Sequence, residues 1–304
     1  MSLKVCYVNT WSGFDENGYS ERCFFSRILR EVDPACTVRV GHEPSENYDL
    51  IISMYRPIPG SKSYADMTAV KTKSLCFTGE SYDLVRTTPG CDAYVGFDLE
   101  DDVRDEVSYL RFPLYAAYHL NNLDKYGCST FEELRGKFVD TKIPKISAVV
   151  SNPSNGLRTS VLKYLLNRDM CVSGGSVHNN AGSVDDKLDF TSKYAVGMAF
   201  ENLSKKSYIT EKVYEVLAVN SVPFYWGASD IAEEFNPDSY IKFDVSNQDA
   251  AQKSCDDVLS LLTDQSRIDK MSQVDPITGF RSEKYIRDGK NILKNFIMNL
   301  VESK

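Results

Sequence analysis

The residues best suited to chemistry stand in the stretch 200–227, which reads FENLSKKSYITEKVYEVLAVNSVPFYWG. A helix that starts near position 208 gathers four apolar side chains on one stripe, at i, i+4, i+7 and i+8: Ile209, Val213, Val216 and Leu217. That stripe is expected to pack on a sheet. The opposite arc then carries four polar side chains: Tyr208, Glu211, Lys212 and Glu215.

Three lysines stand before or within the first turns of this helix: Lys205, Lys206 and Lys212. Cations at a helix N-terminus oppose the helix dipole, at a cost of about 0.3–1 kcal/mol each. A bound anion offsets that cost, and helix N-termini are ready phosphate sites. The pattern therefore indicates a phosphate site. The alternative interpretation is a solvated polar face with Ser207 as N-cap.

A second stretch, SNPSNGLRTSVLKYLLN at 151–167, also has a cationic side chain near the start of a predicted helix. It runs from a strand end through a loop into a helix, and Arg158 falls in the first turn of that helix. A guanidinium group can bind two phosphate oxygens at once. The alternative is a surface arginine paired with Asp169 or a similar carboxylate. Two such cationic sites in one half of the chain favour a diphosphate ligand.

Weaker signals lie elsewhere. Glu80, in SLCFTGES, follows a strand, where catalytic groups of α/β proteins collect, although most such glutamates are merely exposed. The pair Gly174-Gly175 with Ser176 is a turn signal and matches neither nucleotide-binding glycine motif. The segment GFDLEDDVRDE at 96–106 contains an acidic run at 98–106. We interpret this run as a solvated face rather than a metal site.

The elements that position these residues alternate along the chain. Strands are expected at 4–8, 37–40, 50–54, 74–77, 93–97, 146–150, 195–199, 222–225 and 240–243. Helices are expected at 21–32, 131–137, 157–167, 208–219, 250–262 and 283–301. This alternation predicts parallel sheets covered by helices, in two Rossmann-like domains joined near 138–145 and facing a cleft.

Composition and net charge indicate which classes of partner and which location to expect. The chain has 304 residues with a formal net charge of −8, so a nucleic-acid partner is not expected. The eight cysteines and three histidines show no spacing typical of a zinc site. Several of the cysteines stand in apolar runs, which indicates buried thiols in a reducing compartment. No apolar run approaches the roughly 20 residues of a membrane span, and no signal segment precedes the first strand. We expect a cytoplasmic protein.

Eight short segments share an order and spacing that carry a family resemblance. They are FTGE (77–80), YVGFD (94–98), YLRFPLY (109–115), SNPSNGLR (151–158), SGGSVHN (173–179), FENLSKKSYITEK (200–212), and VPFYWG followed by FNPDSYI. Between positions 77 and 244 the chain resembles the α-1,3/4-fucosyltransferases of glycosyltransferase family ten, especially the bacterial soluble members. The FEN…YITEK block is the most specific piece.

The resemblance implies a GT-B fold, with an acceptor domain at 1–140, a GDP-fucose domain at 141–282 and a C-terminal helix, 283–304, that packs back on the first. It implies inverting transfer of L-fucose to a glycan hydroxyl, O3 of GlcNAc in an N-acetyllactosamine-type acceptor, as in protein glycosylation. Glu80 would be the general base, and Arg158 and Lys212 would neutralise the diphosphate. Glu211 would bind ribose or fucose hydroxyls, and the remaining donor residues would line the nucleotide site: Asn202, Tyr208 and, in a donor loop, Gly175, Ser176 and His178.

The resemblance also implies that no metal and no cofactor take part, since cationic side chains stabilise the departing GDP. His178 departs from the arginine that many relatives carry. Heptad repeats and a basic amphipathic tail do not appear, so the sequence supports neither dimerisation nor membrane attachment. Two alternatives stay open: a GT-B transferase for another nucleotide 6-deoxysugar, and a nucleotide-sugar-binding module without turnover.

Overall fold

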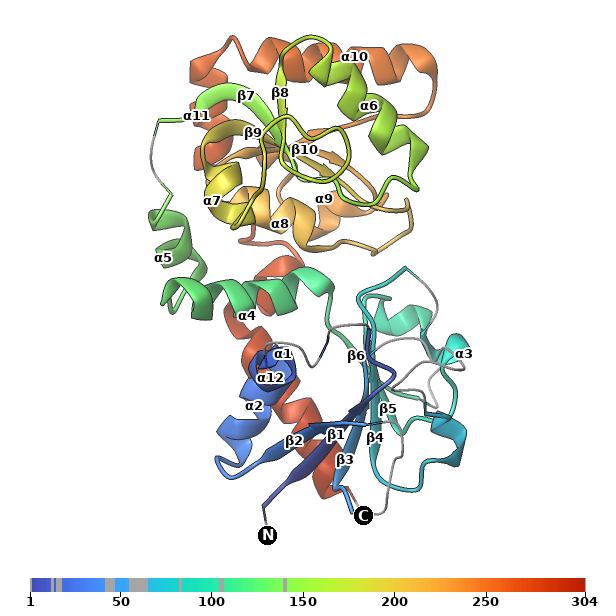
Figure 1. Ribbon diagram of the computed structural model, residues 1–304. Helices are drawn as coiled ribbons and strands as arrows, with labels where there is room; N and C mark the ends of the chain where they lie inside the picture. Colours follow the sequence, from blue (N-terminus) through green and yellow to red (C-terminus); the bar gives the residue numbers. More distant parts are fainter. Residues whose placement is uncertain are drawn as a thin grey trace. The chain divides into compact units, whose positions relative to one another are not determined.

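The computed structural model describes the chain except residues 1, 12–13, 15–17, 42–46, 55–64, 82–83, 104–106, 139–140 and 304. The described residues form two compact units (Figure 1). One contains residues 1–121 and 288–304, and the other residues 122–287. Residues 122–140 therefore group with the second unit, and the last part of the C-terminal helix groups with the first. Part of the acidic run, residues 104–106, lies outside the described residues.

The first unit is built on a six-stranded sheet in the order β2-β1-β3-β4-β5-β6, with every described pairing parallel. Its strands are β1 (Lys4–Val8), β2 (Thr37–Val40), β3 (Leu50–Ser53), β4 (Ser74–Phe77), β5 (Ala93–Gly96) and β6 (Ser108–Arg111). The inner strands β3, β4 and β5 are buried at every residue, as expected for parallel strands covered on both faces.

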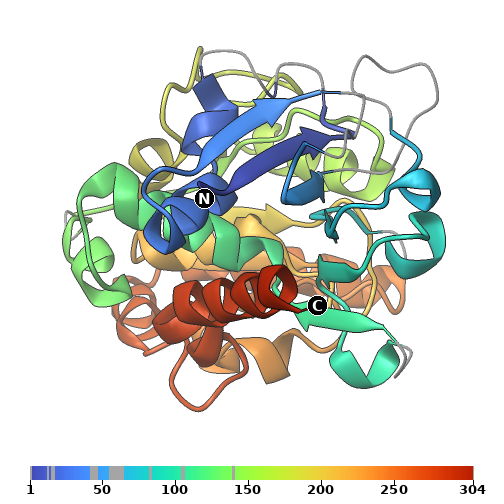
Figure 2. The same ribbon diagram turned by 90° about the horizontal axis from the view of Figure 1, so that it is seen from below.

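Helices lie between these strands and after the last of them. They are α1 (Tyr19–Arg22), α2 (Phe24–Val32), η2 (Met67–Ala69), α3 (Leu84–Thr87), η3 (Glu100–Asp102) and α4 (Leu114–Tyr126), whose last residues belong to the second unit. The C-terminal helix α12 (Ser282–Glu302) adds its later turns to the first unit, where Lys290 pairs with Glu31 of α2 at 2.5 Å. Figure 2 shows α12 in red, close to the C-terminus.

The second unit has a five-stranded parallel sheet in the order β11-β10-β9-β7-β8. Its strands are β7 (Ile143–Ala148), β8 (Cys171–Ser173), β9 (Tyr194–Phe200), β10 (Val222–Trp226) and β11 (Ile241–Lys242). Its helices are α5 (Phe131–Gly136), α6 (Gly156–Leu166), α7 (Lys187–Ser192), α8 (Glu211–Ala218), α9 (Ile231–Glu234), η4 (Pro237–Ser239), α10 (Gln248–Leu261) and α11 (Gln265–Gln273).

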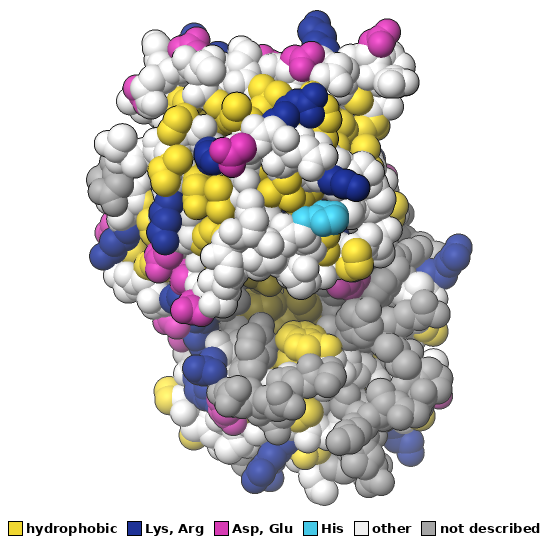
Figure 3. Space-filling view, turned by 45° about the horizontal axis from the view of Figure 1, so that its top comes forward, with side chains coloured by type: hydrophobic (Ala, Val, Ile, Leu, Met, Phe, Trp, Pro, Cys, Tyr) yellow, Lys and Arg dark blue, Asp and Glu magenta, His cyan; other side chains and the backbone are white. Residues whose placement is uncertain are grey.

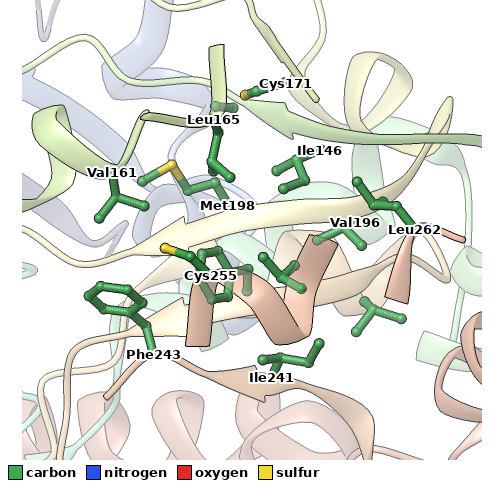
Figure 4. Packing of buried hydrophobic residues seen from close by; sticks show 14 of the residues in the cluster. Ile146, Val161, Leu165, Cys171, Val196, Met198, Ile241, Phe243, Cys255 and Leu262 are labelled. Atoms are coloured by element: carbon green, nitrogen blue, oxygen red, sulfur yellow. The ribbon is translucent and has the colours of Figure 1, made fainter. Parts of the chain in front are cut away.

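Helices cover both faces of this second sheet (Figure 1). On one face, Val161 and Leu165 of α6 and Cys255 of α10 pack against Ile146 and Val196 of the central strands (Figure 4). Each fully buried aliphatic side chain of this kind contributes about 1.5–3 kcal/mol. This core fixes the strands whose ends carry the polar residues.

On the other face, α8 lies unusually close to β9. A Cβ placed on Gly197 would come within 2.4 Å of the Val216 Cγ2 atom, so only glycine allows this approach. Val213, Val216 and Leu217 are all buried, which confirms that the apolar stripe of this helix packs on the sheet.

Three further findings concern the helices, the thiols and the charged surface. Among the described residues, no helix combines the length and the apolar character that a membrane crossing requires. All eight cysteines are described, and all eight thiols are free. On the face drawn in Figure 3, the lysine and arginine side chains of the described residues are scattered among uncharged ones rather than gathered.

Candidate nucleotide-sugar site

The strand order of the second unit marks where a ligand is expected. From β7 the chain moves outward to β8 and then returns to place β9 on the other side of β7. In open parallel sheets the crevice beyond the carboxyl ends at such a reversal is the usual ligand site. The loops that follow β7 and β9 therefore frame the candidate site, and both carry residues singled out from the sequence.

Arg158 and Asn202 meet at this edge. The Arg158 Nη1 atom donates to Asn202 Oδ1 at 2.6 Å, and Nη2 donates to the Asn152 carbonyl oxygen at 2.7 Å. Asn155 caps α6 by accepting from the Arg158 backbone N–H, and its side chain donates to the Asn202 carbonyl oxygen at 3.0 Å. The two loops are thus bonded together, while the Arg158 Nε atom is buried without a hydrogen-bond partner.

The alternative interpretation of Arg158 is wrong. The side chain is not a surface arginine paired with Asp169, because Asp169 pairs with Lys145 at 2.9 Å and only 4% of Arg158 is accessible. Burial lowers the pKa of Arg158, an effect that the nearby Glu201, Tyr208 and Glu211 oppose. The guanidinium is therefore a buried charge at the edge of the sheet.

The helix that follows β9 starts later than the sequence predicts. It begins at Glu211, with Thr210 as N-cap. The predicted start near Tyr208 is therefore wrong, and so is the alternative in which Ser207 is the N-cap. Ser207 instead adopts a left-handed backbone with φ 62°, and Asp230 accepts from its backbone N–H at 2.7 Å and its hydroxyl at 2.9 Å. Tyr208 consequently lies in the preceding turn, buried to 2% exposure.

A buried carboxylate organises the start of α8. Glu201, fully buried, accepts from the Thr210 backbone N–H at 2.8 Å and from its hydroxyl at 2.6 Å. Its Oε2 atom also lies 3.3 Å from the Lys212 Nζ atom. Burial raises the pKa of Glu201 and Lys212 opposes that rise. Glu201 therefore ties the end of β9 to the first turn of α8.

Lys212 is ion-paired on two sides. Its Nζ atom lies 3.3 Å from Glu211 Oε1, as it does from Glu201, and donates to the Thr210 hydroxyl at 2.9 Å. Burial lowers its pKa, but the two carboxylates outweigh burial and raise it overall. About 19% of the side chain remains accessible. Lys212 is therefore held in its charged form, and part of its side chain is accessible to a ligand.

Lys187, on α7, completes the network. Its ammonium group pairs closely with Glu215 and lies 3.8 Å from Glu211 Oε1. Glu215, expected on an open polar arc of α8, is instead buried to 4% exposure against this lysine. Arg158, Lys187 and Lys212 line one cavity of about 20 Å³, so cations from α6, α7 and α8 converge beside the β7–β9 edge.

The glycine pair after β8 brings a third loop to the same place. A Cβ on Gly175 would lie 2.2 Å from the Val150 carbonyl oxygen, so this approach requires glycine. The Ser176 hydroxyl donates to the Ser151 carbonyl oxygen at 3.0 Å. His178 follows with φ 49° and is exposed. The loop at 174–178 therefore packs on the segment that leads from β7 to Arg158.

Glu80 lies in the first unit. Strand β4 ends at Phe77, and the Glu80 backbone N–H donates to the hydroxyl of the buried Thr78 at 3.0 Å. The Glu80 side chain is exposed. It thus stands just beyond the carboxyl edge of the first sheet, with its carboxylate accessible. The described part of the acidic run, which includes η3, contains no group of acidic, histidine or cysteine side chains arranged to hold a metal.

Sequence reasoning missed three residues of this network: Lys187, Glu201 and Asp230. Glu201 directly precedes Asn202 at a strand end, and a glutamate at the end of a buried strand is a usable signal. Lys187 and Asp230 lie 24 and 23 residues from the residues they hold, Glu211 and Ser207, and no local pattern marks them.

Comparison with known proteins shows which family the second unit is similar to. Residues 139–270 match the model of "Glycosyltransferase family 10 (fucosyltransferase) C-term". The alpha-(1,3)-fucosyltransferase of Helicobacter pylori is 26% identical over 281 residues, which cover 82% of this chain and 55% of that protein. An alpha-(1,4)-fucosyltransferase of Arabidopsis thaliana is 27% identical over 205 residues, 58% of this chain and 51% of that protein. The chain thus spans about half the length of these two relatives.

Solved structures share the fold. A crystal structure of an α1,3-fucosyltransferase matches with a TM-score of 0.74 at 24% identity, covering 100% of this chain and 91% of that chain. The crystal structure of α1,3-fucosyltransferase with GDP-fucose matches with a TM-score of 0.72 at 23% identity and the same coverage. These likenesses confirm the α/β, GT-B class expected for the two parallel-sheet units. In sequence, residues 139–270 are thus similar to the C-terminal part of glycosyltransferase family 10, the fucosyltransferases, and the whole chain shares the fold of a solved α1,3-fucosyltransferase.

Proposed function

We propose that the protein is an inverting fucosyltransferase that moves L-fucose from GDP-fucose to a hydroxyl of an acceptor glycan. One observation carries the donor half of this proposal. Arg158 of α6 and Lys212 of α8 approach each other across one cavity of about 20 Å³, within the segment that matches the family model, and Arg158 bonds to Asn202 at the carboxyl edge of β9. The cavity has room for about one water molecule, so it marks where the two cations converge and not the volume of the ligand. Two cations from different helices suit a ligand with two neighbouring phosphates.

Arg158 and Lys212 would neutralise the diphosphate as it departs. Charge that develops on a leaving group is best stabilised by groups already held in place, and the bonds of Arg158 to Asn202 and Asn152 hold it. Glu211 would accept hydrogen bonds from ribose or fucose hydroxyls. Asn202, Tyr208 and the loop at 174–178, which includes Gly175, Ser176 and His178, would line the nucleotide. No metal and no further cofactor enter this proposal.

Glu80 would act as general base. Its exposed carboxylate at the end of β4 can accept the proton of an acceptor hydroxyl as that oxygen attacks the anomeric carbon. A single displacement of this kind inverts the anomeric centre. We propose O3 of GlcNAc in an N-acetyllactosamine-type glycan as the acceptor, residues 1–140 as the acceptor domain and residues 141–282 as the donor domain. The eight free thiols suit a reducing compartment, and we place the protein in the cytoplasm.

A calorimetric donor screen tests the donor assignment. GDP-fucose and GDP are expected to bind, while guanosine, which has no phosphate to pair with Arg158 and Lys212, binds at least about tenfold more weakly, the equivalent of one charged contact. Binding of UDP tests whether the site selects the guanine base of the nucleotide, and binding of GDP-mannose tests whether it selects fucose. Tighter binding of another GDP-6-deoxysugar would reassign the donor sugar. Equal binding of UDP and GDP, or of guanosine and GDP, would contradict the proposed site.

A further inference from the structure

Glu211 stands between two ammonium groups. Its Oε1 atom lies 3.3 Å from the Lys212 Nζ atom, on the same helix, and 3.8 Å from the Lys187 Nζ atom of α7. Lys187 is the first residue of α7, directly after Asp186, whose side chain caps the helix by accepting from the Asp189 backbone N–H at 3.0 Å. The capped helix therefore presents Lys187 to Glu211 from a fixed position.

The network holds more carboxylates than ammonium groups. Three buried or nearly buried carboxylates share two lysines in the ion pairs of the described residues: Glu201, Glu211 and Glu215, with Lys187 and Lys212. Donor binding as proposed above turns Lys212 toward a diphosphate. Glu201 then still accepts two hydrogen bonds from Thr210. Glu211 keeps one ammonium partner, Lys187.

On the basis of the proposed function, we infer that Lys187 is a positioning residue for donor binding. It holds Glu211 ionised and in place when Lys212 transfers its pairing to the diphosphate. Without Lys187, releasing Lys212 would strand a carboxylate in a site with little water, and such a group takes up a proton instead. Lys187 thus makes it possible for Lys212 to leave its carboxylate partners.

The protonation states agree with this role. Burial raises the pKa of Glu211, but Lys212 and then Lys187 overcome it and bring the pKa to about 2. Burial lowers the pKa of Lys187, while Glu215 and Glu211 raise it overall. Among the described residues, the charged groups that interact electrostatically with Glu211 are Lys187, Lys212, Glu201, Glu215 and Arg158.

The test is proton uptake on binding, measured by titration calorimetry with GDP-fucose in two buffers of different ionisation enthalpy. GDP-fucose suits this test because both of its phosphates are esterified and the ligand takes up no proton near neutral pH. The variants are Lys187→Met, which removes the charge, and Lys187→Arg, which keeps it. Lys193→Met, at the exposed C-terminal end of α7, is the matched control.

Wild type, Lys187→Arg and Lys193→Met are expected to bind with the same proton uptake. Lys187→Met is expected to bind about tenfold more weakly at pH 7, the equivalent of one lost charged contact, and to take up additional protons, up to about one. In this variant the Glu211 pKa rises when Lys212 leaves, and the carboxylate takes up a proton on binding. The affinity of Lys187→Met for GDP-fucose should therefore improve as the pH falls. Because Glu215 is buried, the double variant Lys187→Met with Glu215→Gln removes the second stranded charge and protects the fold.

Two outcomes would overturn the inference while wild type still binds. In one, Lys187→Met and the double variant bind with wild-type affinity and proton uptake. In the other, affinity falls with no change in proton uptake and Lys187→Arg is equally weak, which marks a purely structural lysine. Failure of the wild-type protein to bind GDP-fucose is a separate result, because it contradicts the proposed function itself.

Discussion

Replacing Glu80 with glutamine is expected to lower turnover by roughly 10²–10⁴-fold, the usual contribution of a general base. Glutamine keeps the size and the hydrogen-bonding oxygen of the side chain but cannot accept the proton of the attacking hydroxyl. Because the Glu80 side chain is exposed and only its backbone is bonded, to Thr78, the melting temperature should stay near that of wild type. The affinity for GDP-fucose should also stay unchanged, since donor binding is assigned to the other unit.

Initial rates of GDP release with a saturating acceptor measure this effect. Glu100→Gln is the matched control, because Glu100 is an exposed glutamate of the short helix η3 in the same unit. It is expected to turn over like wild type. A Glu80→Gln enzyme within threefold of wild type would remove Glu80 from the mechanism.

The second large effect concerns the donor cations. Lys212→Met removes a charged contact to the diphosphate and Arg158→Lys removes the two-pronged guanidinium contact, each worth about 1.5–3 kcal/mol, so GDP should bind roughly ten- to a hundredfold more weakly. Arg158→Lys keeps the charge but loses the planar fork, which one ammonium cannot replace. Guanosine should bind wild type and variants alike. The double variant need not be additive, because both residues act on one ligand.

The Arg158 side chain also contributes to stability. Arg158 is buried and bonded to Asn202 and Asn152, so Arg158→Ala removes two hydrogen bonds from a charged donor, each worth about 1.5–3 kcal/mol. We therefore expect a lower melting temperature for Arg158→Ala. Lys163→Met, on the exposed side of α6, is the control for both readouts. Variants that bind GDP as tightly as wild type would place the donor site elsewhere.

The sequence predicted the inner strands well and missed two at the edges. Continuous apolar runs such as LIIS and SLCF mark strands buried on both faces, and β3 and β4 lie where they were expected. The missed strands, β6 and β8, each end a sheet in the strand order. β6 reads SYLR and is only partly buried, and β8 has three residues, so neither shows a long apolar run.

The family motifs named the residues of the proposed donor site, but they did not predict the contacts and the burial of these residues. Arg158 and Asn202 are in direct contact, which the sequence order does not show. The helix start shifted from 208 to 211 because tertiary partners decided it: Asp230 holds Ser207 in a left-handed turn, and Glu201 holds Thr210. Local patterns cannot reveal such partners, since each lies on another segment of the chain.

The most direct test of fucosyl transfer is the mass of the acceptor after incubation with GDP-fucose in excess EDTA. We expect N-acetyllactosamine to gain one deoxyhexose, GDP to appear in equal amount, and Glu80→Gln to abolish most of both. Loss of transfer in EDTA that Mn²⁺ restores would show that a metal, rather than Arg158 and Lys212 alone, holds the diphosphate. GDP-fucose that binds but is transferred to no glycan in a broad acceptor panel would contradict the assignment as a transferase.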